Sequence, residues 1–415
     1  MKRLALVIAL AAGCTSIEPR ERYETQGRPY APRGADEWPL EGTGPASSLR
    51  SVPDYEPQPA PPQPERRLRG GELDDNDRFD EYLHYRDHVA GRVRGSVHPL
   101  EVSDRVTLRV LDAAGRPASG ARIILRDLAG APLARRTATA DGRALFFPRA
   151  EQSPQQDEWV IEATLGDCQA RKVVTSGQET VTLRLDGERP RARPALDVVF
   201  CLDCTGSMGD EIDRLKATID SVARRLAQLQ GSPRVRLGLV KYRDRGDDYV
   251  VQKDDLTPEL ATFREALSGA YASGGGDYPE DVQAGLAAAV DEIGWDRSPT
   301  AARIVFLVGD APPHLYQDEQ AYTTTIRHAQ EKGVKVCTLA ASGLDDAGEY
   351  VWRQLAEATL GRFIFISYGT PGGGRGTPHH TGPYLENDLD EIVVRQCARE
   401  VDALTRGATP LDRDQ

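Results

Sequence analysis

The second half of the chain alternates near-continuous apolar runs with segments of helical period, and this alternation limits the fold more than any other feature. Residues 195–203 (ALDVVFCLD) and 302–310 (ARIVFLVGD) are almost uninterrupted apolar runs, typical of strands buried on both faces of a sheet. Between such runs, apolar residues recur three or four positions apart. We therefore predict an α/β domain with a doubly wound, mostly parallel sheet.

The expected elements follow in strict alternation. Strands are expected at 195–203, 235–242, 302–310, 334–340 and 362–368, and helices at 209–229, 258–270, 281–293, 319–333, 349–361 and 389–404.

Residues 91–187 show the period of two that marks strands with one buried face. Val106, Leu108 and Val110 alternate with polar residues, and turn signals recur every 8–12 residues through this region. We predict a small all-β sandwich domain over 91–187. Its sequence resembles the carboxypeptidase-regulatory-like, transthyretin-type modules, which implies a spacer without an active site. The matching positions are Gly115, Pro117, Gly120, Ala121, Thr139, Asp141, Gly142 and Phe146.

The first residues have the pattern of an export signal. Two basic residues precede a nine-residue apolar stretch, Leu4 to Ala12, which is too short to span a bilayer. The following Ala-Ala-Gly-Cys resembles the lipobox of bacterial lipoproteins and predicts a signal peptide over 1–14 with lipidation at Cys14. Because Thr15 is not Asp, an outer-membrane anchor is the expected destination, on its periplasmic face or at the cell surface. An ordinary cleaved secretion signal is the alternative.

Residues 15–90 are expected to be a disordered, Pro-rich linker. Eleven of the 28 prolines lie between Pro19 and Pro64. Such segments adopt extended polyproline II and hold a domain away from a surface. A short helix is expected within 72–90.

Composition excludes several classes of function. The net charge of −12 repels a phosphate backbone, so nucleic acid is not an expected partner. No run approaches 18 apolar residues, which excludes a polytopic membrane protein. Of six cysteines, five remain if Cys14 is lipidated, so not all of them pair within the chain.

Oxygen-bearing side chains follow two of the predicted strands. Asp203, Thr205 and Ser207 come directly after the first strand, and Asp310 ends the 302–310 strand. If the strand order is 3-2-1-4-5-6, these two strands flank the point where the order reverses, and the four side chains converge there. An all-oxygen set with two carboxylates suits Mg²⁺, with Ca²⁺ or Mn²⁺ as alternatives.

The motif Asp203-x-Thr205-Gly206-Ser207 after a buried strand resembles the von Willebrand factor A (vWA) domain and its metal-ion-dependent adhesion site. The substrings YRDRGDDYV, GGGDYPED and GDAPPH resemble the hemicentin and alpha-kinase-associated branch, and the resemblance covers about 195–405. The family's distal Thr ligand is absent from the Gly-rich loop, so Asp277 or, less favoured, Glu280 is expected to replace it. His314 is expected to be a further ligand or to contact the ligands, and this role is favoured over that of a catalytic base.

Three other motifs have more ordinary interpretations. Cys201 and Cys204 form a CxxC, but Cys201 lies inside a predicted strand, which favours buried thiols or a structural disulfide over redox chemistry. Residues 245–247 spell Arg-Gly-Asp within a longer loop pattern, for which a structural role is favoured. His379 and His380 lie in a Gly-rich loop, expected to be solvated rather than a second metal site.

The vWA resemblance implies a protein whose cation keeps one coordination position for an Asp or Glu of a protein partner. We therefore expect a non-enzymatic, lipid-anchored envelope protein that works in adhesion or complex assembly. A metal-dependent hydrolase or phosphoryl-transfer accessory is the alternative, and it requires a base or nucleophile over the metal. A structural envelope protein with a vestigial site is a third interpretation.

Overall fold

The computed structural model describes residues 68–151, 157–367, 379–382 and 384–406. Cys14, the export signal and the Pro-rich stretch up to residue 67 lie outside the described residues. Among the helices that are described, none combines the length and the apolar character needed to cross a membrane.

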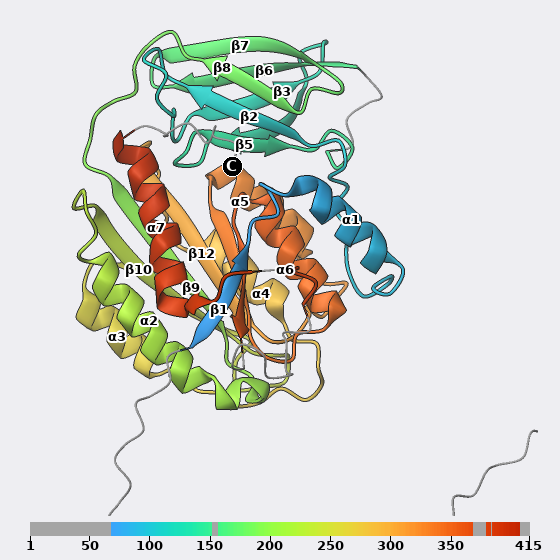
Figure 1. Ribbon diagram of the computed structural model, residues 1–415, viewed down its shortest axis with the longest axis vertical. Helices are drawn as coiled ribbons and strands as arrows, with labels where there is room; N and C mark the ends of the chain where they lie inside the picture. Colours follow the sequence, from blue (N-terminus) through green and yellow to red (C-terminus); the bar gives the residue numbers. More distant parts are fainter. Residues whose placement is uncertain (1–67, 152–156, 368–378, 383, 407–415) are drawn as a thin grey trace, which may run out of the picture. The chain divides into compact units, whose positions relative to one another are not determined.

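One eight-stranded sheet forms the larger part of the molecule (Figure 1). Its order is β11-β10-β9-β12-β13-β14-β1-β15, and β10, β9, β12, β13 and β14 run parallel. Numbered from β9, the first six strands follow the order 3-2-1-4-5-6, so the predicted doubly wound fold is confirmed. The strands are β9 (Ala195–Asp203), β10 (Arg234–Tyr242), β11 (Val251–Thr257), β12 (Ala301–Gly309), β13 (Lys335–Ala340), β14 (Phe363–Ser367), β1 (Arg69–Leu73) and β15 (Asn387–Asp388).

Helices cover both faces of this sheet, and side chains of β9 point alternately into two cores. Val199 and Cys201 belong to one core, whereas Val198 and Phe200 belong to the other. The first core is closed by α1 (Phe79–Ala90), α4 (Val282–Ala287), the π-helical turn η2 (Ala288–Glu292), α5 (Tyr322–Lys332) and α6 (Asp346–Ala358). The second is closed by the 3₁₀ turn η1 (Gly206–Asp210), α2 (Ile212–Leu226), α3 (Leu260–Ser268) and α7 (Leu389–Arg406).

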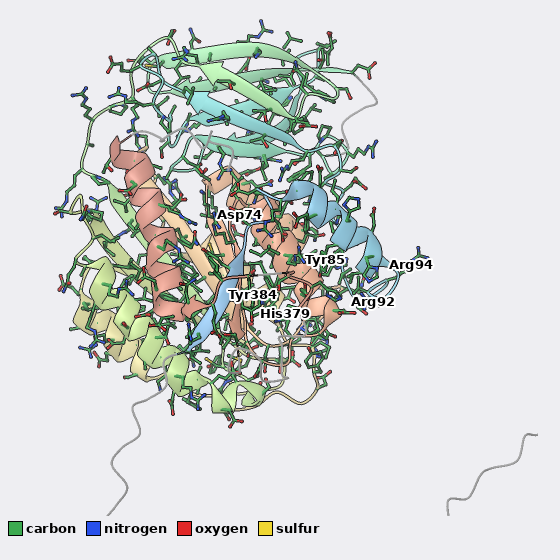
Figure 2. All side chains as sticks on the ribbon, in the orientation of Figure 1. Asp74, Tyr85, Arg92, Arg94, His379 and Tyr384 are labelled. Carbon is green, nitrogen blue, oxygen red and sulfur yellow. The ribbon has the colours of Figure 1, made fainter. Side chains whose placement is uncertain are left out.

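Strand β1 and helix α1 correct the predicted extent of the linker, because residues 69–90 are built into the domain. β1 pairs antiparallel with β14, and a Cβ on Gly70 would lie 2.3 Å from the Phe365 carbonyl oxygen. Tyr82 and Tyr85 of α1 are buried in the first core, and Tyr85 lies beside α6 in Figure 2. The expected helix within 72–90 is confirmed by α1.

The region before the sheet folds as two small sheets over a common core, which confirms the expected β-sandwich architecture. One has the order β5-β2-β8 and the other β4-β3-β6-β7. Their strands are β2 (Val106–Leu111), β3 (Arg122–Arg126), β4 (Pro132–Thr137), β5 (Arg143–Phe146), β6 (Glu158–Leu165), β7 (Cys168–Thr175) and β8 (Thr180–Arg184).

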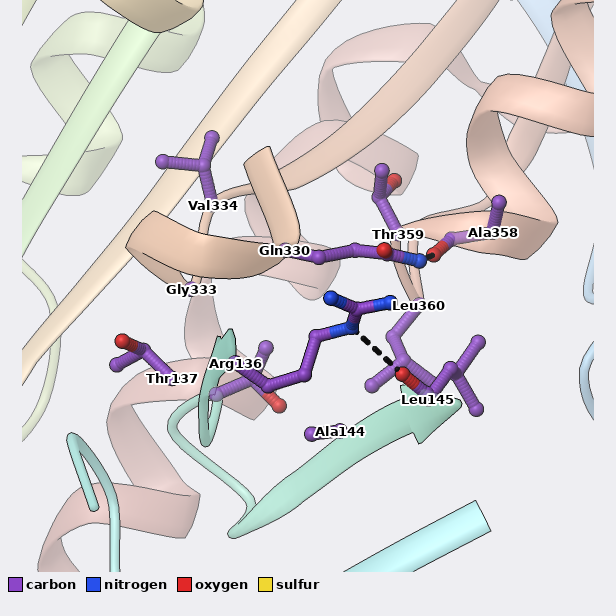
Figure 3. Close-up of a pocket in the computed structure, with 11 residues that line it drawn as sticks. Arg136, Thr137, Ala144, Leu145, Gln330, Gly333, Val334, Ala358, Thr359 and Leu360 are labelled. Atoms are coloured by element: carbon purple, nitrogen blue, oxygen red, sulfur yellow. Dashed lines mark hydrogen bonds between the residues drawn. The ribbon is translucent and has the colours of Figure 1, made fainter. Parts of the chain in front are cut away.

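The sandwich contacts the larger sheet at the amino ends of its parallel strands, within the compact unit Pro62–Gln415. Lys335, at the start of β13, forms ion pairs with Asp141 of the sandwich (3.2 Å) and Glu400 of α7 (2.7 Å). Figure 3 shows a small cavity at this seam, where the Arg136 guanidinium donates to the Leu145 carbonyl (2.9 Å). The carboxyl ends of the strands, where the candidate site lies, are at the other end of the sheet.

Candidate functional site

The two central strands place the first site residues side by side. β9 and β12 pair in parallel, with Leu202 opposite Val308, so Asp203 and Asp310 follow at the same edge of the sheet. Asp203 is fully buried, and Asp310 is 5% exposed. This edge is where ligands bind in open α/β sheets, because the strand order reverses between β9 and β12.

A chain of oxygen atoms connects the two aspartates. Oδ1 of Asp203 accepts hydrogen bonds from the Thr205 backbone N–H (2.9 Å) and hydroxyl (2.6 Å). The Thr205 hydroxyl lies 3.2 Å from that of Ser207, which donates to Oδ1 of Asp310 (3.0 Å). The structure thus brings together Asp203, Thr205, Ser207 and Asp310, and the site opens to solvent at the exposed Ser207.

The Gly-rich loop supplies the remaining buried carboxylate, which belongs to Glu280. Its backbone N–H donates to the Pro312 carbonyl (3.0 Å), and its carbonyl accepts from the His314 N–H (2.9 Å). Gly275 has φ +71°, and a Cβ there would lie 3.0 Å from Oε1 of Glu280. This loop therefore needs glycine to let the Glu280 side chain approach Thr205.

Two carboxylate oxygens of the site are buried without a hydrogen bond. They are Oδ2 of Asp203 and Oε2 of Glu280, and Glu280 is only 2% exposed. In the part of the chain that the structure describes, no lysine or arginine forms an ion pair with Asp203, Glu280 or Asp310. A buried, unpaired carboxylate oxygen is costly, so the site lacks a positive partner.

The raised pKa values of the carboxyl groups at the site reflect the same lack of positive charge. Burial, and then the charge of Asp310, raises the pKa of Asp203 to about 7, against a small opposing effect of the Thr205 and Tyr242 hydroxyls. Burial, and then the charge of Asp203, raises the pKa of Glu280 to about 9. Burial also raises the pKa of Asp310. Carboxyls that repel one another and lack a cation bind protons more tightly.

This donor set fits a divalent metal ion. Carboxylate and hydroxyl oxygens are the ligands that Mg²⁺, Ca²⁺ and Mn²⁺ take in proteins. The candidate ligands are Asp203, Thr205, Ser207, Glu280 and Asp310. A cation bound there would neutralise the crowded charges.

Asp277, which the sequence analysis favoured as the replacement for the missing Thr ligand, does not lie among the candidate ligands around Asp203. Its side chain is 61% exposed, and its carboxylate lies 3.2 Å from Nε2 of His314 rather than among the contacts of Asp203. Between the two replacements considered for the missing Thr, the structure thus favours Glu280. His314 does lie beside the site, but its ring faces Asp277 and Asp244.

Sequence reasoning missed Asp244, which follows β10, whereas Asp247 belongs to the Arg-Gly-Asp segment for which a structural role was favoured. Oδ2 of Asp247 accepts from the backbone N–H groups of Gly275 (2.9 Å) and Asp244 (3.2 Å), and so ties this loop to the Gly-rich loop. Arg245 of the same Arg-Gly-Asp segment pairs with Asp318 (2.9 Å). These side chains serve contacts within the domain. The signal that could have pointed to them was the YRDRGDDYV substring itself.

The CxxC motif and the two adjacent histidines lie in surroundings that favour structural roles. Cys201 and Cys204 are both buried free thiols, and burial raises the pKa of Cys204 to about 11, which disfavours thiolate chemistry. His379, expected in a solvated loop, is instead buried, with Nδ1 3.4 Å from Glu349 of α6 (Figure 2). His380 lies 3.2 Å from the same carboxylate.

Comparisons with known proteins concern the domain that contains this site. Residues 197–368, which contain every candidate ligand, match the family described as the von Willebrand factor A domain. The alpha-protein kinase vwkA of Dictyostelium discoideum is 26% identical over 177 residues, which cover 38% of this chain and 27% of that protein. The chain thus spans about a quarter of the length of this curated relative.

Two kinds of solved structure are also similar at low TM-scores. The pilus adhesin SpaC of Lactobacillus rhamnosus GG is 11% identical with a TM-score of 0.37, over 60% of this chain and 32% of the adhesin. Proximal thread matrix protein 1 of the mussel byssus, solved with a zinc-occupied MIDAS motif, is 16% identical with a TM-score of 0.30, over 38% and 41% of the two chains.

The fold and the strand-end residues define a doubly wound domain with a candidate site for a divalent cation. The family match adds the particular class: residues 197–368 match the von Willebrand factor A domain.

Proposed function

We propose that this chain is a lipid-anchored envelope protein whose vWA domain binds a protein partner through a divalent cation. The cation is held by Asp203, Thr205, Ser207, Glu280 and Asp310, and it bonds to an Asp or Glu of the partner. The observation that carries the proposal is the pair of buried carboxylate oxygens without partners, Oδ2 of Asp203 and Oε2 of Glu280. They support the proposal because a bound cation would supply the positive charge that they lack.

The surroundings of the site support a protein partner. Two large side chains of the segment between α3 and α4, Tyr271 and Tyr278, are 55% and 42% exposed. The Tyr278 hydroxyl donates to the Gly343 carbonyl (2.8 Å), and the Tyr271 carbonyl accepts from the buried Arg243 (3.1 Å). Exposed tyrosines on a rigid frame are enriched at protein interfaces because they bury much area at little entropic cost.

The alternative function, a metal-dependent hydrolase, is not supported by a comparable observation. A hydrolytic site needs a base or nucleophile over the metal. The nearest candidate, His314, has its Nε2 turned toward Asp244 and Asp277 instead. We therefore propose a binding protein rather than an enzyme.

The test is capture of partners from the native envelope with the full chain as bait. Wild type is expected to retain specific proteins in Mg²⁺ and release them in EDTA, and Asp203→Ala is expected to retain none of them. Asp213→Ala is the matched control, since the Asp213 side chain on α2 is 88% exposed and pairs only with Lys216 at 3.1 Å. Capture that Asp203→Ala and EDTA leave unchanged would contradict the proposal.

The anchor has its own test. Cys14→Ser is expected to shift the chain from the membrane to the soluble fraction. A variant that still sediments with membranes to the wild-type extent would rule out lipidation at Cys14.

A further inference from the structure

Arg243 is a buried arginine that follows directly after β10, the strand beside β9. Its side chain is only 1% exposed. Among the described residues, the one carboxylate that pairs with it belongs to Asp248, which lies 3.8 Å away and is itself 81% exposed. An arginine rarely leaves water without a buried carboxylate beside it, so this guanidinium needs another explanation.

The guanidinium donates to backbone carbonyls of two other segments. Its Nε donates to the Cys204 carbonyl (3.0 Å), and its Nη2 donates to the Tyr271 carbonyl (3.1 Å). Cys204 lies between the candidate ligands Asp203 and Thr205, and Tyr271 lies on the segment that leads into the Gly-rich loop. Arg243 therefore links the two segments that carry Asp203 and Glu280.

The link to Cys204 acts on the orientation of Asp203. The Cys204 carbonyl and the Thr205 N–H belong to one planar trans peptide group, so they point in opposite directions. The carbonyl also accepts from the Ser273 N–H (3.0 Å), and the Thr205 N–H donates to Oδ1 of Asp203 (2.9 Å). Fixing the carbonyl on Arg243 therefore directs the N–H toward Oδ1 and orients the Asp203 carboxylate.

The guanidinium is itself held in place by two aromatic rings. Its Cζ lies 4.4 Å from the centre of the Tyr249 ring and 4.7 Å from that of the Tyr271 ring. Contacts of this kind attract a cation to an aromatic face. An outer residue can orient a metal ligand only if it is fixed by contacts of its own, as Arg243 is.

We propose that Arg243 is a positioning residue of the cation site. It orients the Asp203 carboxylate through the peptide group between Cys204 and Thr205 and is not a ligand itself. This inference rests on the cation site of the proposed function, but neither on the protein partner nor on the lipid anchor.

The experiment compares the full-length wild type with Arg243→Met, which removes the donors and keeps an unbranched side chain. Calorimetric titration of the EDTA-stripped chains with Mg²⁺ is expected to give a Kd about 10- to 100-fold higher in the variant, the usual cost of losing an outer contact to a metal ligand. A second measurement uses no metal: the amide hydrogen of Thr205 is expected to exchange faster with solvent in the variant.

Arg303→Met is the matched control. Arg303 is also buried (4% exposed), and its Nε and Nη2 also donate to two backbone carbonyls, those of Asp296 and Ser298. It lies near the amino end of β12, opposite Asp197 and away from the candidate ligands. Its loss is expected to lower the Tm while leaving the Mg²⁺ Kd and the exchange of the Thr205 amide unchanged.

Arg243→Lys is a second variant, which decides the test if Arg243→Met does not fold. Lysine keeps the charge but lacks the planar fork that reaches two carbonyls at once. Its Mg²⁺ Kd is expected to lie between those of wild type and Arg243→Met.

The outcomes separate this inference from the cation site itself. Wild type that binds no Mg²⁺ would contradict the proposed function and the inference together. Wild type that binds Mg²⁺, with a Kd unchanged in the folded Arg243 variants, would overturn the inference alone. A Kd raised equally in Arg303→Met, or raised in Arg243→Met without faster exchange at Thr205, would also overturn it.

Discussion

Strand β9 carries two buried aspartates, one near each end, and their surroundings differ sharply. Both Asp197 and Asp203 are fully buried. Asp197 accepts two hydrogen bonds from the guanidinium of Arg236 (2.9 and 2.6 Å) and one from the Asp296 N–H (2.7 Å). Asp203 has the Thr205 N–H and hydroxyl and the Tyr242 hydroxyl as donors, and among the described residues no lysine or arginine forms an ion pair with it.

We interpret this difference as that between a carboxylate with a structural role, Asp197, and a carboxylate available to bind a ligand, Asp203. Arg236 lies directly opposite Asp197 on β10, so the fold itself supplies the counter-ion. At the carboxyl end of the same strand, the neighbours of Asp203 are Asp310 and Glu280, which add negative charge. A buried carboxylate without a counter-ion among the described residues is a candidate to take its counter-ion from solution.

The largest expected effect is a pH dependence of the free energy of unfolding. It arises at the Asp203 end of β9 and not at the Asp197 end. With a pKa of about 7 in the folded state, Asp203 keeps its proton where the unfolded chain has already lost it at about pH 4. The favourable contribution of protonated Asp203 to the free energy of unfolding is therefore fully present below pH 4 and is lost as the pH rises toward 8. At about 1.4 kcal/mol per pKa unit, this amounts to as much as about 4 kcal/mol.

Urea unfolding in EDTA between pH 4 and 8 measures this loss. The difference in free energy of unfolding between wild type and Asp203→Asn isolates Asp203 from the other carboxyls. That difference should shrink in excess Mg²⁺. A difference that stays constant across this pH range would show that Asp203 is not a crowded, unpaired acid.

The next largest effect concerns Asp197. Arg236→Met removes its counter-ion and leaves a buried, unpaired carboxylate, which should lower the free energy of unfolding by about 3 kcal/mol. The loss should be equal in Mg²⁺ and in EDTA.

Arg234→Met is the control for this prediction. Arg234 lies on the same strand but is 57% exposed, so its pair with Asp296 should contribute less than about 1 kcal/mol. If Arg236→Met lowered the free energy of unfolding as little as Arg234→Met, the proposed difference between the two ends of β9 would be contradicted.

The smallest effect distinguishes the two acids of the Gly-rich loop. Glu280→Gln removes a buried carboxylate of the cation site and should weaken Mg²⁺ binding at least tenfold, about 1.4 kcal/mol. Asp277→Asn changes an exposed side chain outside the oxygen set and should alter Mg²⁺ affinity less than threefold. Calorimetric titration of both variants compares them directly, and the reverse ranking would restore Asp277 as the ligand.

The sequence predicts the doubly wound, mostly parallel sheet and most of the candidate site because apolar runs and strand ends are local signals. Asp203, Thr205, Ser207 and Asp310 all follow strands that are recognisable from burial alone. Strand β11 was missed because it is a polar edge strand (VQKDDLT) with mostly exposed side chains. β1 was missed because its Gly70 and Gly71 contribute backbone rather than an apolar pattern.

The choice between Asp277 and Glu280 depended on information that is not local. Both residues follow the turn at Gly274 and Gly275, whose positive φ angles redirect the chain. The direction of each side chain is then set by the bridge between Glu280 and Pro313, which lies 33 residues further along. Asp244 escaped notice for the same reason, since its partners come from two other loops.

The most direct test of the account is the thermal stability of the EDTA-stripped chain with and without Mg²⁺. Wild type should gain about 2.7 kcal/mol at a hundredfold excess over Kd, seen as a higher Tm. Asp203→Ala should show no Mg²⁺-dependent shift, and its metal-free Tm should equal or exceed that of wild type because one repelling charge is gone. A wild-type Tm indifferent to millimolar Mg²⁺, Ca²⁺ and Mn²⁺, or a shift that survives in Asp203→Ala, would contradict a cation at this end of β9.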